Sequence, residues 1–254
     1  DEHFGELALH FLESGDKDKA LDYFLKAGEK AAKIYANGEA VSYFQHALGV
    51  LEGKEGACQE KARVLETLGD IKKIVGEYDI SMKRWNEALL LWKQLDEKEK
   101  VARLHRKMAM TLWRDVGNTE KARENFEEAL RILEAEPEGA ELAALHAARA
   151  TMSYFTEDVT KARSWAEKAL EVGKKLNAFE GIASAYIDLG LVFDATGERK
   201  EAVQCMEKAL KIALDNGHVD IALRAYHNLA MELPAEENER RLDLLEKGLE
   251  LAKK

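Results

Sequence analysis

The sequence predicts an all-α protein, a right-handed superhelix (solenoid) of antiparallel helical hairpins. Ala, Leu, Glu and Lys, which favour helices, are abundant, whereas the 254 residues include only 2 prolines and 7% aromatic residues. A second observation is an Ala-Leu pair that ends a helical pattern at Ala88, Ala129, Ala169 and Ala209. These pairs recur about every forty residues, a period typical of repeat proteins.

The third observation is that each Ala-Leu pair closes a small, large, small pattern of side chains. One large residue at a constant position in each repeat indicates the core between neighbouring hairpins, rather than an aromatic ligand site. The period extends back to Ala47 and forward to Gly248, so we expect a single repeat domain over 1–254. The complete patterns are Ser81, Trp85 and Ala88; Ala122, Phe126 and Ala129; Ala162, Trp165 and Ala169; and Ala202, Met206 and Ala209.

Residues 1–54 are predicted to form three atypical helices. The first, over 2–13, ends where Gly15 can take the left-handed conformation that closes a helix. The second and third, which begin near Asp18 and Ala40, carry the same Ala and Phe pattern after only about half of the later period. Terminal repeats commonly deviate in this way, because one side of the array lacks a neighbour.

Five regular hairpins follow, over 55–96, 97–137, 138–177, 178–217 and 218–254. Gly76 and Gly197 mark turns within hairpins, and Thr119 is expected to cap the helix that follows it. The expected helices are 60–75, 79–94, 98–116, 120–133, 142–155, 161–176, 179–195, 198–214, 219–233 and 238–253.

The first helix of each hairpin carries a large residue followed by a small one. A small residue lets two helix backbones approach closely, as stacked hairpins require. The pairs are Leu68-Gly69, Met108-Ala109, Leu189-Gly190 and Leu229-Ala230, whereas Arg149-Ala150 departs from the pattern.

These positions together resemble the tetratricopeptide repeat, in a variant whose helices are about a turn longer than usual. The best copy comprises Tyr186, Leu189, Gly190, Phe193, Ala202, Met206 and Ala209. The resemblance implies a tetratricopeptide-like superhelix that binds a protein or peptide.

A narrower resemblance covers about the first fifty residues, with Leu12-Glu13-Ser14-Gly15-Asp16 and Tyr35-Ala36-Asn37-Gly38-Glu39-Ala40 among its motifs. This segment is similar to the entry into the repeats of large prokaryotic signal-transduction ATPases, a group that includes the maltose-regulon activator. The resemblance implies the regulatory part of such an ATPase or transcription regulator, and the start at Asp1 suggests an excised domain. Because no Gly-x-x-x-x-Gly-Lys-Ser/Thr phosphate loop occurs, we expect no ATP hydrolysis.

Composition argues against several other classes of function. A net charge of −10 and a pI near 5.4 disfavour direct nucleic-acid binding. No apolar run is long enough to span a membrane, and Cys58 and Cys205 lack metal-ligand spacing, so we expect a cytoplasmic protein. No nucleophile motif or paired-carboxylate motif stands out. We therefore expect no enzyme activity, no metal and no cofactor.

The first helices should form a concave wall, the usual binding surface of solenoids. Arg103, Arg106, Lys107 and Arg114 concentrate positive charge there, which suits a carboxylate, an acidic peptide or a phosphate. The alternative is that these cations pair with acidic residues on the preceding helix.

A pocket for a small inducer is predicted beside this basic wall. Ala144, Ala147 and Ala148 leave space that Tyr154 could close. The alternative is that this Ala-rich helix simply packs tightly.

Asn228 resembles the asparagine with which many such repeats hold a peptide backbone, because its amide both donates and accepts hydrogen bonds. Asp188 takes the equivalent place one repeat earlier. The candidate binding residues are Arg63, Glu66, Asp70, Arg103, Arg106, Lys107, Arg114, Tyr154, Asp188, Arg224, His227 and Asn228.

The leading prediction is therefore a module that senses a peptide or small inducer in its groove. A constitutive peptide-binding scaffold is the first alternative. The second is self-association: Leu242, Leu245 and Leu249 give the last helix more apolar surface than one neighbour needs, so this end pairs with another copy or continues into further repeats.

Overall fold

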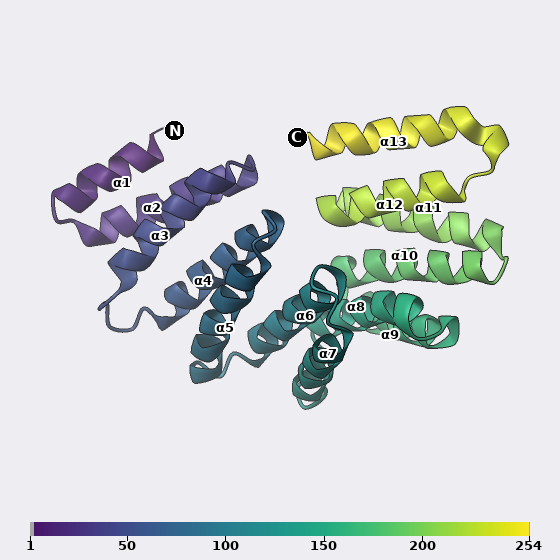
Figure 1. Cartoon of the computed structure of the whole chain (residues 1–254), viewed down its shortest axis with the longest axis horizontal. Coiled ribbons are helices and arrows are strands. Elements are labelled where there is room, and N and C mark those ends of the chain that lie inside the picture. The colour runs from purple at the N-terminus through teal and green to yellow at the C-terminus, as the bar shows by residue number, and fades with distance from the viewer. Residues whose placement is uncertain (1–2, 254) are drawn as a thin grey trace. The chain divides into compact units, whose positions relative to one another are not determined.

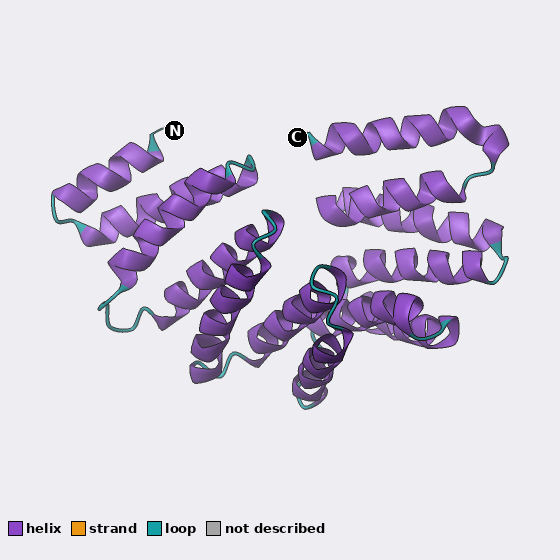
Figure 2. Cartoon of the chain, viewed as in Figure 1, coloured by secondary structure: helices purple, strands orange, loops and turns teal. Residues whose placement is uncertain are grey.

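A computed structural model of the chain describes residues 3–253, whose regular structure is entirely helical (Figures 1 and 2). It confirms the all-α array of helical hairpins. The chain forms two compact units, Asp1–Gly117 and Asn118–Lys254. Because the boundary lies within the predicted hairpin 97–137, the single domain and the exact hairpin limits stay predictions.

Unit 1 contains six helices within its described residues. They are α1 (Phe4–Glu13), α2 (Lys17–Lys33), α3 (Asn37–Leu51), α4 (Cys58–Ile74), α5 (Tyr78–Gln94) and α6 (Lys98–Arg114).

Helix α2 packs against both α1 and α3, so it is shared by two hairpins at the start of the array. Phe24 on α2 and Phe44 on α3 are both buried, as their shared pattern predicts. Helix α4 pairs with α5, and α6 packs on α5.

Unit 2 contains seven α-helices and one 3-10 helix within its described residues. They are α7 (Thr119–Glu134), α8 (Ala140–Thr156), α9 (Val159–Leu176), α10 (Phe179–Ala195), α11 (Arg199–Asp215), α12 (Val219–Glu232), η1 (Ala235–Glu237) and α13 (Asn238–Ala252).

The hairpins of unit 2 are α8 with α9, α10 with α11, and α12 with α13. Helix α10 also packs against α8 and α12, so the first helices of three hairpins lie side by side (Figure 1). Met206 and Ala209 are fully buried between these hairpins, as the repeat pattern predicts.

The turns follow the predicted glycines, with one correction at a cap. Gly15, Gly76 and Gly197 have φ angles of 83°, 79° and 82°, where other residues are strained. Helix α7 is capped by Asn118, whose side chain accepts a hydrogen bond from the Lys121 backbone N–H. The prediction that Thr119 is the cap is therefore wrong; Asn is the stronger cap and Thr119 becomes the first helical residue.

The predicted stripe of large core residues is also broken at one hairpin. Trp85, Phe126 and Met206 are each at most 2% exposed, whereas Trp165 is only half-buried. Helix α9 places Ala166, which is fully buried, four residues after its first small residue, where the other repeats carry the large one. Trp165 thus comes one residue before the core position of α9.

Two further findings concern the described residues 3–253. None of their helices is both long and apolar enough to cross a membrane. No three His, Cys, Asp or Glu side chains among them converge as a metal site requires.

Both cysteines are free thiols: Cys58 is exposed at the start of α4, and Cys205 is buried within α11, where burial raises its pKa.

Candidate functional site

The first-helix face of unit 1 is organised by a buried carboxylate, Glu66 on α4. Arg103 on α6 donates from Nε and Nη2 to its two oxygens, each at 3.0 Å, and Lys107 Nζ lies 2.9 Å from Oε1. The Trp92 indole N–H also donates to Glu66, at 3.3 Å. Burial alone would raise the pKa of Glu66, but Lys107 and Arg103 more than offset it and lower that pKa.

Asp70, one turn after Glu66, continues this network. Its carboxylate accepts hydrogen bonds from Lys107 Nζ at 2.8 Å and from the Trp85 indole N–H at 3.0 Å. The predicted basic patch is thus neutralised at Arg103 and Lys107, as the pairing alternative requires. Of the other predicted cations, Arg106 is half-buried on α6, and Arg63 and Arg114 are exposed on α4 and α6.

The predicted space beside the alanines of α8 is filled. Ala144, Ala147 and Ala148 are each at most 9% exposed. Gly181 on α10 approaches so closely that a Cβ atom on it would lie 2.7 Å from the Cβ of Ala143. The expectation of an inducer pocket at these alanines is therefore wrong, because small residues serve here to bring two helices together.

Polar residues do gather on the first helices of unit 2, and this surface is called the unit 2 wall. The residues of this wall either occupy repeat positions that are expected to face the groove or contact side chains at such positions. Its residues are Thr151 and Tyr154 on α8, Asp188 and Asp194 on α10, and Arg224, Asn228 and Glu232 on α12.

Asp188 is the buried centre of the unit 2 wall. Its side chain is 0% exposed, and its Oδ1 accepts a hydrogen bond from Thr151 Oγ1 at 2.8 Å. The guanidinium of Arg224 lies 3.7 Å from Oδ1, and within residues 3–253 no donor reaches Oδ2. Burial raises the pKa of Asp188 to about 7, although Arg224 and Thr151 act in the opposite direction.

A second acidic feature of this wall joins α10 and α12. The carboxyl group of Glu232 is buried beside that of Asp194 and hydrogen-bonds to it. Burial, this hydrogen bond and the Asp194 charge raise the pKa of Glu232 to about 7, with Arg199 opposing. Burial and the two neighbouring carboxylates also raise the pKa of Tyr154. The pair therefore concentrates negative charge beside a tyrosine.

The remaining predicted residues of unit 2 lie on α12. Arg224 and Asn228 are half-buried and one helical turn apart, so they share a face, whereas His227 is exposed. The structure thus places Arg224 and Asn228 on one face of α12 and brings Arg224 beside Asp188.

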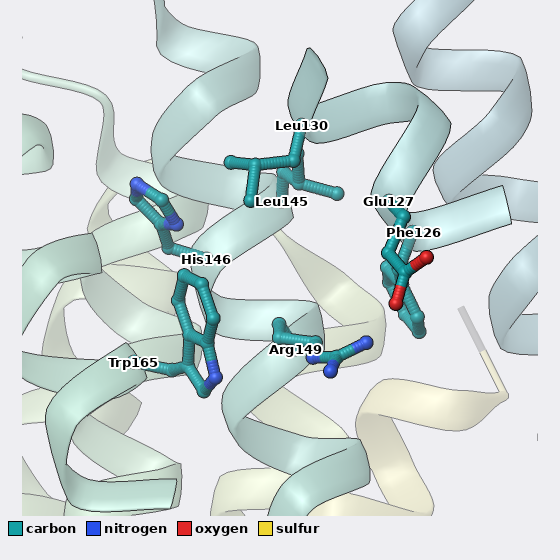
Figure 3. Close-up of a pocket in the computed structure, with 7 residues that line it drawn as sticks. All are labelled: Phe126, Glu127, Leu130, Leu145, His146, Arg149 and Trp165. Atoms are coloured by element: carbon teal, nitrogen blue, oxygen red, sulfur yellow. The ribbon is translucent and has the colours of Figure 1, made fainter. Parts of the chain in front are cut away.

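A pocket that the sequence analysis missed lies among α7, α8 and α9. It holds about 240 Å³ and is lined by Phe126, Glu127, Leu130, Leu145, His146, Arg149 and Trp165 (Figure 3). Arg149 occupies the position of the buried Leu68, Leu189 and Leu229 in the other first helices. The departure at Arg149-Ala150 was therefore the sequence signal for this pocket.

Comparison with known proteins places this geometry in a family. The family model for the tetratricopeptide repeat matches residues 60–135 and 141–215. Among curated proteins, none matches the sequence significantly.

Solved structures with a similar fold include three proteins. BtubC from P. vanneervenii is 20% identical, with a TM-score of 0.63 over 85% of this chain and 87% of that one. The Rap protein complexed with competence and sporulation factor is 20% identical, with a TM-score of 0.69 over 90% of this chain and 64% of that one. A signal transduction ATPase with numerous domains and a tetratricopeptide repeat sensor, from Pyrococcus horikoshii, is 18% identical, with a TM-score of 0.57 over 100% of this chain and 40% of that one.

At these identities the likenesses show a shared fold and nothing more. The family assignment rests instead on the sequence match, which spans more than half of the residues. This chain belongs to the tetratricopeptide repeat family.

Proposed function

We propose that this chain is a peptide-binding module, and that the unit 2 wall holds an extended segment of a partner protein. The likeness to the Rap protein, which was solved with competence and sporulation factor, shows only the shared fold. The case for a peptide therefore rests on the chemistry of the wall.

The observation that carries the proposal is the acid pair of Asp194 and Glu232. Burial raises the pKa of Glu232 most, and the neighbouring Asp194 carboxyl group raises it further, because two adjacent carboxylates repel each other. A Lys or Arg side chain of a bound peptide would relieve the repulsion through charge-assisted hydrogen bonds. The partner segment should therefore carry a basic residue at a fixed position.

Asn228 and Arg224 supply the second half of the proposed site. The Asn228 amide can donate to a peptide carbonyl and accept from a peptide N–H. The Arg224 side chain is about 30% exposed, and its guanidinium lies 3.7 Å from the buried Asp188, so Arg224 remains accessible from the wall. Together they would fix the main chain of an extended segment while the acid pair selects its side chain.

The test is selection from a random peptide library with the isolated chain, followed by affinity measurements on variants. Selected peptides should share a Lys or Arg, and Asn228→Ala should weaken them at least tenfold, since buried polar groups would lose partners. Glu232→Gln combined with Asp194→Asn should remove the preference for a basic residue. Asn86→Ala, an exposed asparagine on α5, is the matched control and should bind as the wild type does.

Peptides that bind Asn228→Ala and wild type equally would contradict the proposal. A selection that enriches acidic peptides would contradict it as well, because the acid pair would repel them.

We further propose that peptide binding is regulatory and that it acts in the cytoplasm as part of a larger regulator. The resemblance of about the first fifty residues to signal-transduction ATPases and the two free thiols support this role. A regulatory ligand must bind two conformations with different affinity. Small-angle scattering should therefore show a change in radius of gyration when a selected peptide binds; an unchanged radius would favour a constitutive scaffold.

Self-association is a second candidate, favoured by the exposed face of α13. Leu242 and Leu249 are 53% and 56% exposed, and Leu245 is 38% exposed, on the same helix. A second copy of the chain would bury this stripe. Light scattering should detect a dimer that Leu242→Glu with Leu249→Glu converts to monomer; a wild type that stays monomeric at high concentration would exclude the idea.

A further inference from the structure

The pocket among α7, α8 and α9 arises where the repeat pattern fails twice in one hairpin. The core position of α9 holds Ala166, while the other repeats place Trp85, Phe126 or Met206 there. The core position of α8 holds Arg149, whose charged head cannot fill an apolar core. A small alanine and a charged arginine thus stand where the other hairpins carry large apolar side chains, and the pocket lies beside them.

Arg149 forms the polar end of this pocket. Its guanidinium lies 5.8 Å from the Phe126 ring centre and 5.9 Å from that of Trp165, within range of cation–π attraction. In Figure 3 its head lies between these two rings, with Leu130 and Leu145 at the opposite side of the space. The pocket is thus apolar along its length and cationic at one end.

Two residues that line the pocket each have a buried polar atom without a partner among the described residues. Within the described residues, no acceptor reaches Arg149 Nη1 and no partner reaches His146 Nδ1, although both atoms are buried. The His146 side chain is 7% exposed and stacks on Trp165 with ring centres 5.3 Å apart. Burial, with a smaller effect of Lys168, lowers the pKa of His146 to about 4, so the imidazole is neutral at pH 7.

Arg149 shares a carboxylate with other cations near this site. The Glu157 carboxylate lies 3.5 Å from Arg149 and is shared with Arg123 and Lys161 at the same distance. Lys168 Nζ lies 4.4 Å from the Trp165 ring centre. Glu127 is the acidic residue among the pocket-lining side chains, and it is exposed.

We propose that this pocket binds a small monocarboxylate with an aromatic or branched aliphatic body. The carboxylate would accept from the partly exposed guanidinium of Arg149, and the apolar body would lie against Phe126, Leu145 and Trp165. A volume of about 240 Å³ is below the range of about 300–1,000 Å³ for drug-sized ligands, so the ligand is compact. Charge-assisted hydrogen bonds favour the ionised acid over its amide.

This site is separate from the unit 2 wall. Successive residues of an α-helix are about 100° apart, so Leu145 and Arg149 lie on one face of α8 while Thr151 and Tyr154 lie nearly opposite. A carboxylate in the pocket would therefore bind together with a peptide on the wall, and the inference stands whether or not the wall binds a peptide.

The experiment follows the indole N–H resonance of Trp165 during titration of the isolated chain with phenylacetate and with 4-methylpentanoate at pH 7. The chain has 4 tryptophans, and a Trp165→Phe spectrum identifies the relevant signal. Both acids should shift it saturably, reaching most of the change at about 10 mM, which corresponds to about 90% occupancy for a Kd of 1 mM. Phenylacetamide should bind at least tenfold more weakly, and 2-phenylethylammonium should cause no saturable shift.

Variants of Arg149 test whether the carboxylate of the ligand binds at this residue. Arg149→Leu, which restores the repeat pattern, and Arg149→Gln should each weaken phenylacetate at least tenfold, because a charge-assisted hydrogen bond is lost. Arg131→Leu, an exposed arginine on α7, is the matched control and should leave binding within twofold of wild type. Thermal melting by circular dichroism verifies that each variant is folded.

Three results would overturn the proposal. One is the absence of a saturable Trp165 shift with either acid. The second is equal affinity for phenylacetate and phenylacetamide, a comparison that needs only the wild type. The third is a folded Arg149→Leu protein that binds phenylacetate as the wild type does.

Discussion

At the scale of single residues, Glu66 and Asp188 carry the same chemical group in opposite environments. Glu66 accepts hydrogen bonds from Arg103, Lys107 and the Trp92 indole, so both of its oxygens are satisfied. Asp188 accepts one hydrogen bond, from Thr151 to Oδ1, and the guanidinium of Arg224 lies beyond hydrogen-bonding distance. Buried charge is tolerated in proteins when it is paired. The paired Glu66 therefore stabilises the fold, whereas the incompletely paired Asp188 costs folding free energy.

Glu66→Gln should lower the free energy of unfolding by about 1.5–3 kcal/mol at pH 7, the range for hydrogen bonds to charged groups. Arg103 and Lys107 are partly exposed and can be rehydrated, so a larger loss is not expected. The pKa of Glu66 is lowered in the fold, so its contribution is present above the unfolded value and is lost as pH falls through the folded value.

Urea denaturation at pH 7 and near pH 3 measures this effect. The difference between wild type and Glu66→Gln should shrink at the lower pH, while Glu99→Gln, an exposed carboxyl change on α6, should have little effect at either pH. A difference that is the same at both pH values would contradict the ion-pair explanation.

Asp188→Asn, unlike Glu66→Gln, should raise the free energy of unfolding above neutral pH. The fold raises the pKa of Asp188 from 3.8 to about 7, so wild-type stability falls as pH rises between these values. Asn does not titrate, and at pH 8 the variant should be more stable by at most about 4 kcal/mol, the equivalent of three pKa units. Thermal melting between pH 4 and 8 should show a shallower pH dependence in the variant; parallel curves would contradict the prediction.

At the scale of helices, close packing depends on glycines that leave room for a neighbour. Gly181 on α10 meets Ala143 on α8, and an added Cβ would also lie 2.9 Å from the Ala143 carbonyl carbon. Backbone cannot move as a flexible side chain can. We therefore expect Gly181→Ala to destabilise unit 2 by about 1–3 kcal/mol, the range for overpacking.

Gly49→Ala on α3 is the matched control, because nothing lies within 4 Å of the Cβ it would add. Alanine is the better helix former, so this variant should gain up to about 1 kcal/mol. Chemical denaturation measures both variants, and a Gly181→Ala protein as stable as the wild type would mean that α8 and α10 separate easily.

Most helices were predictable from the sequence because their apolar residues recur at helical spacing. Helix α10 spans 179–195 as predicted, and the remaining regular helices differ by a few residues at their ends. Element ends depend on local caps, as Asn118 in place of Thr119 shows for α7.

The candidate site was less predictable, because it depends on which side chains meet across helices. Sequence spacing placed Arg103 and Glu66 on the first helices of successive hairpins but left open whether they pair or bind a ligand. The pocket at Arg149 left a visible departure in the repeat pattern, yet its size follows from the packing around Ala166.

At the scale of the whole molecule, stability should be local. Repeat proteins make contacts mainly between neighbouring elements, so their stability is approximately a sum of local terms. Each of the two compact units has buried clusters of its own, one within 8–71 and others within 147–244.

Native-state hydrogen exchange should therefore show that each variant destabilises only the helices near its substitution. Gly181→Ala should speed amide exchange in α8 to α11 and leave α2 and α3 unchanged, whereas Glu66→Gln should act on α4 to α6. Uniform acceleration along the chain in either variant would indicate one cooperative unit instead.

The contrast between the two thiols makes the natural sequence convenient for spectroscopy. Maleimide reagents attack the exposed thiolate, so at neutral pH they should modify Cys58 and spare Cys205, which is buried and whose pKa is raised. A fluorophore or spin label can thus be attached at a single known point on α4 without removing any cysteine. Any second label then needs only one engineered cysteine elsewhere in the chain.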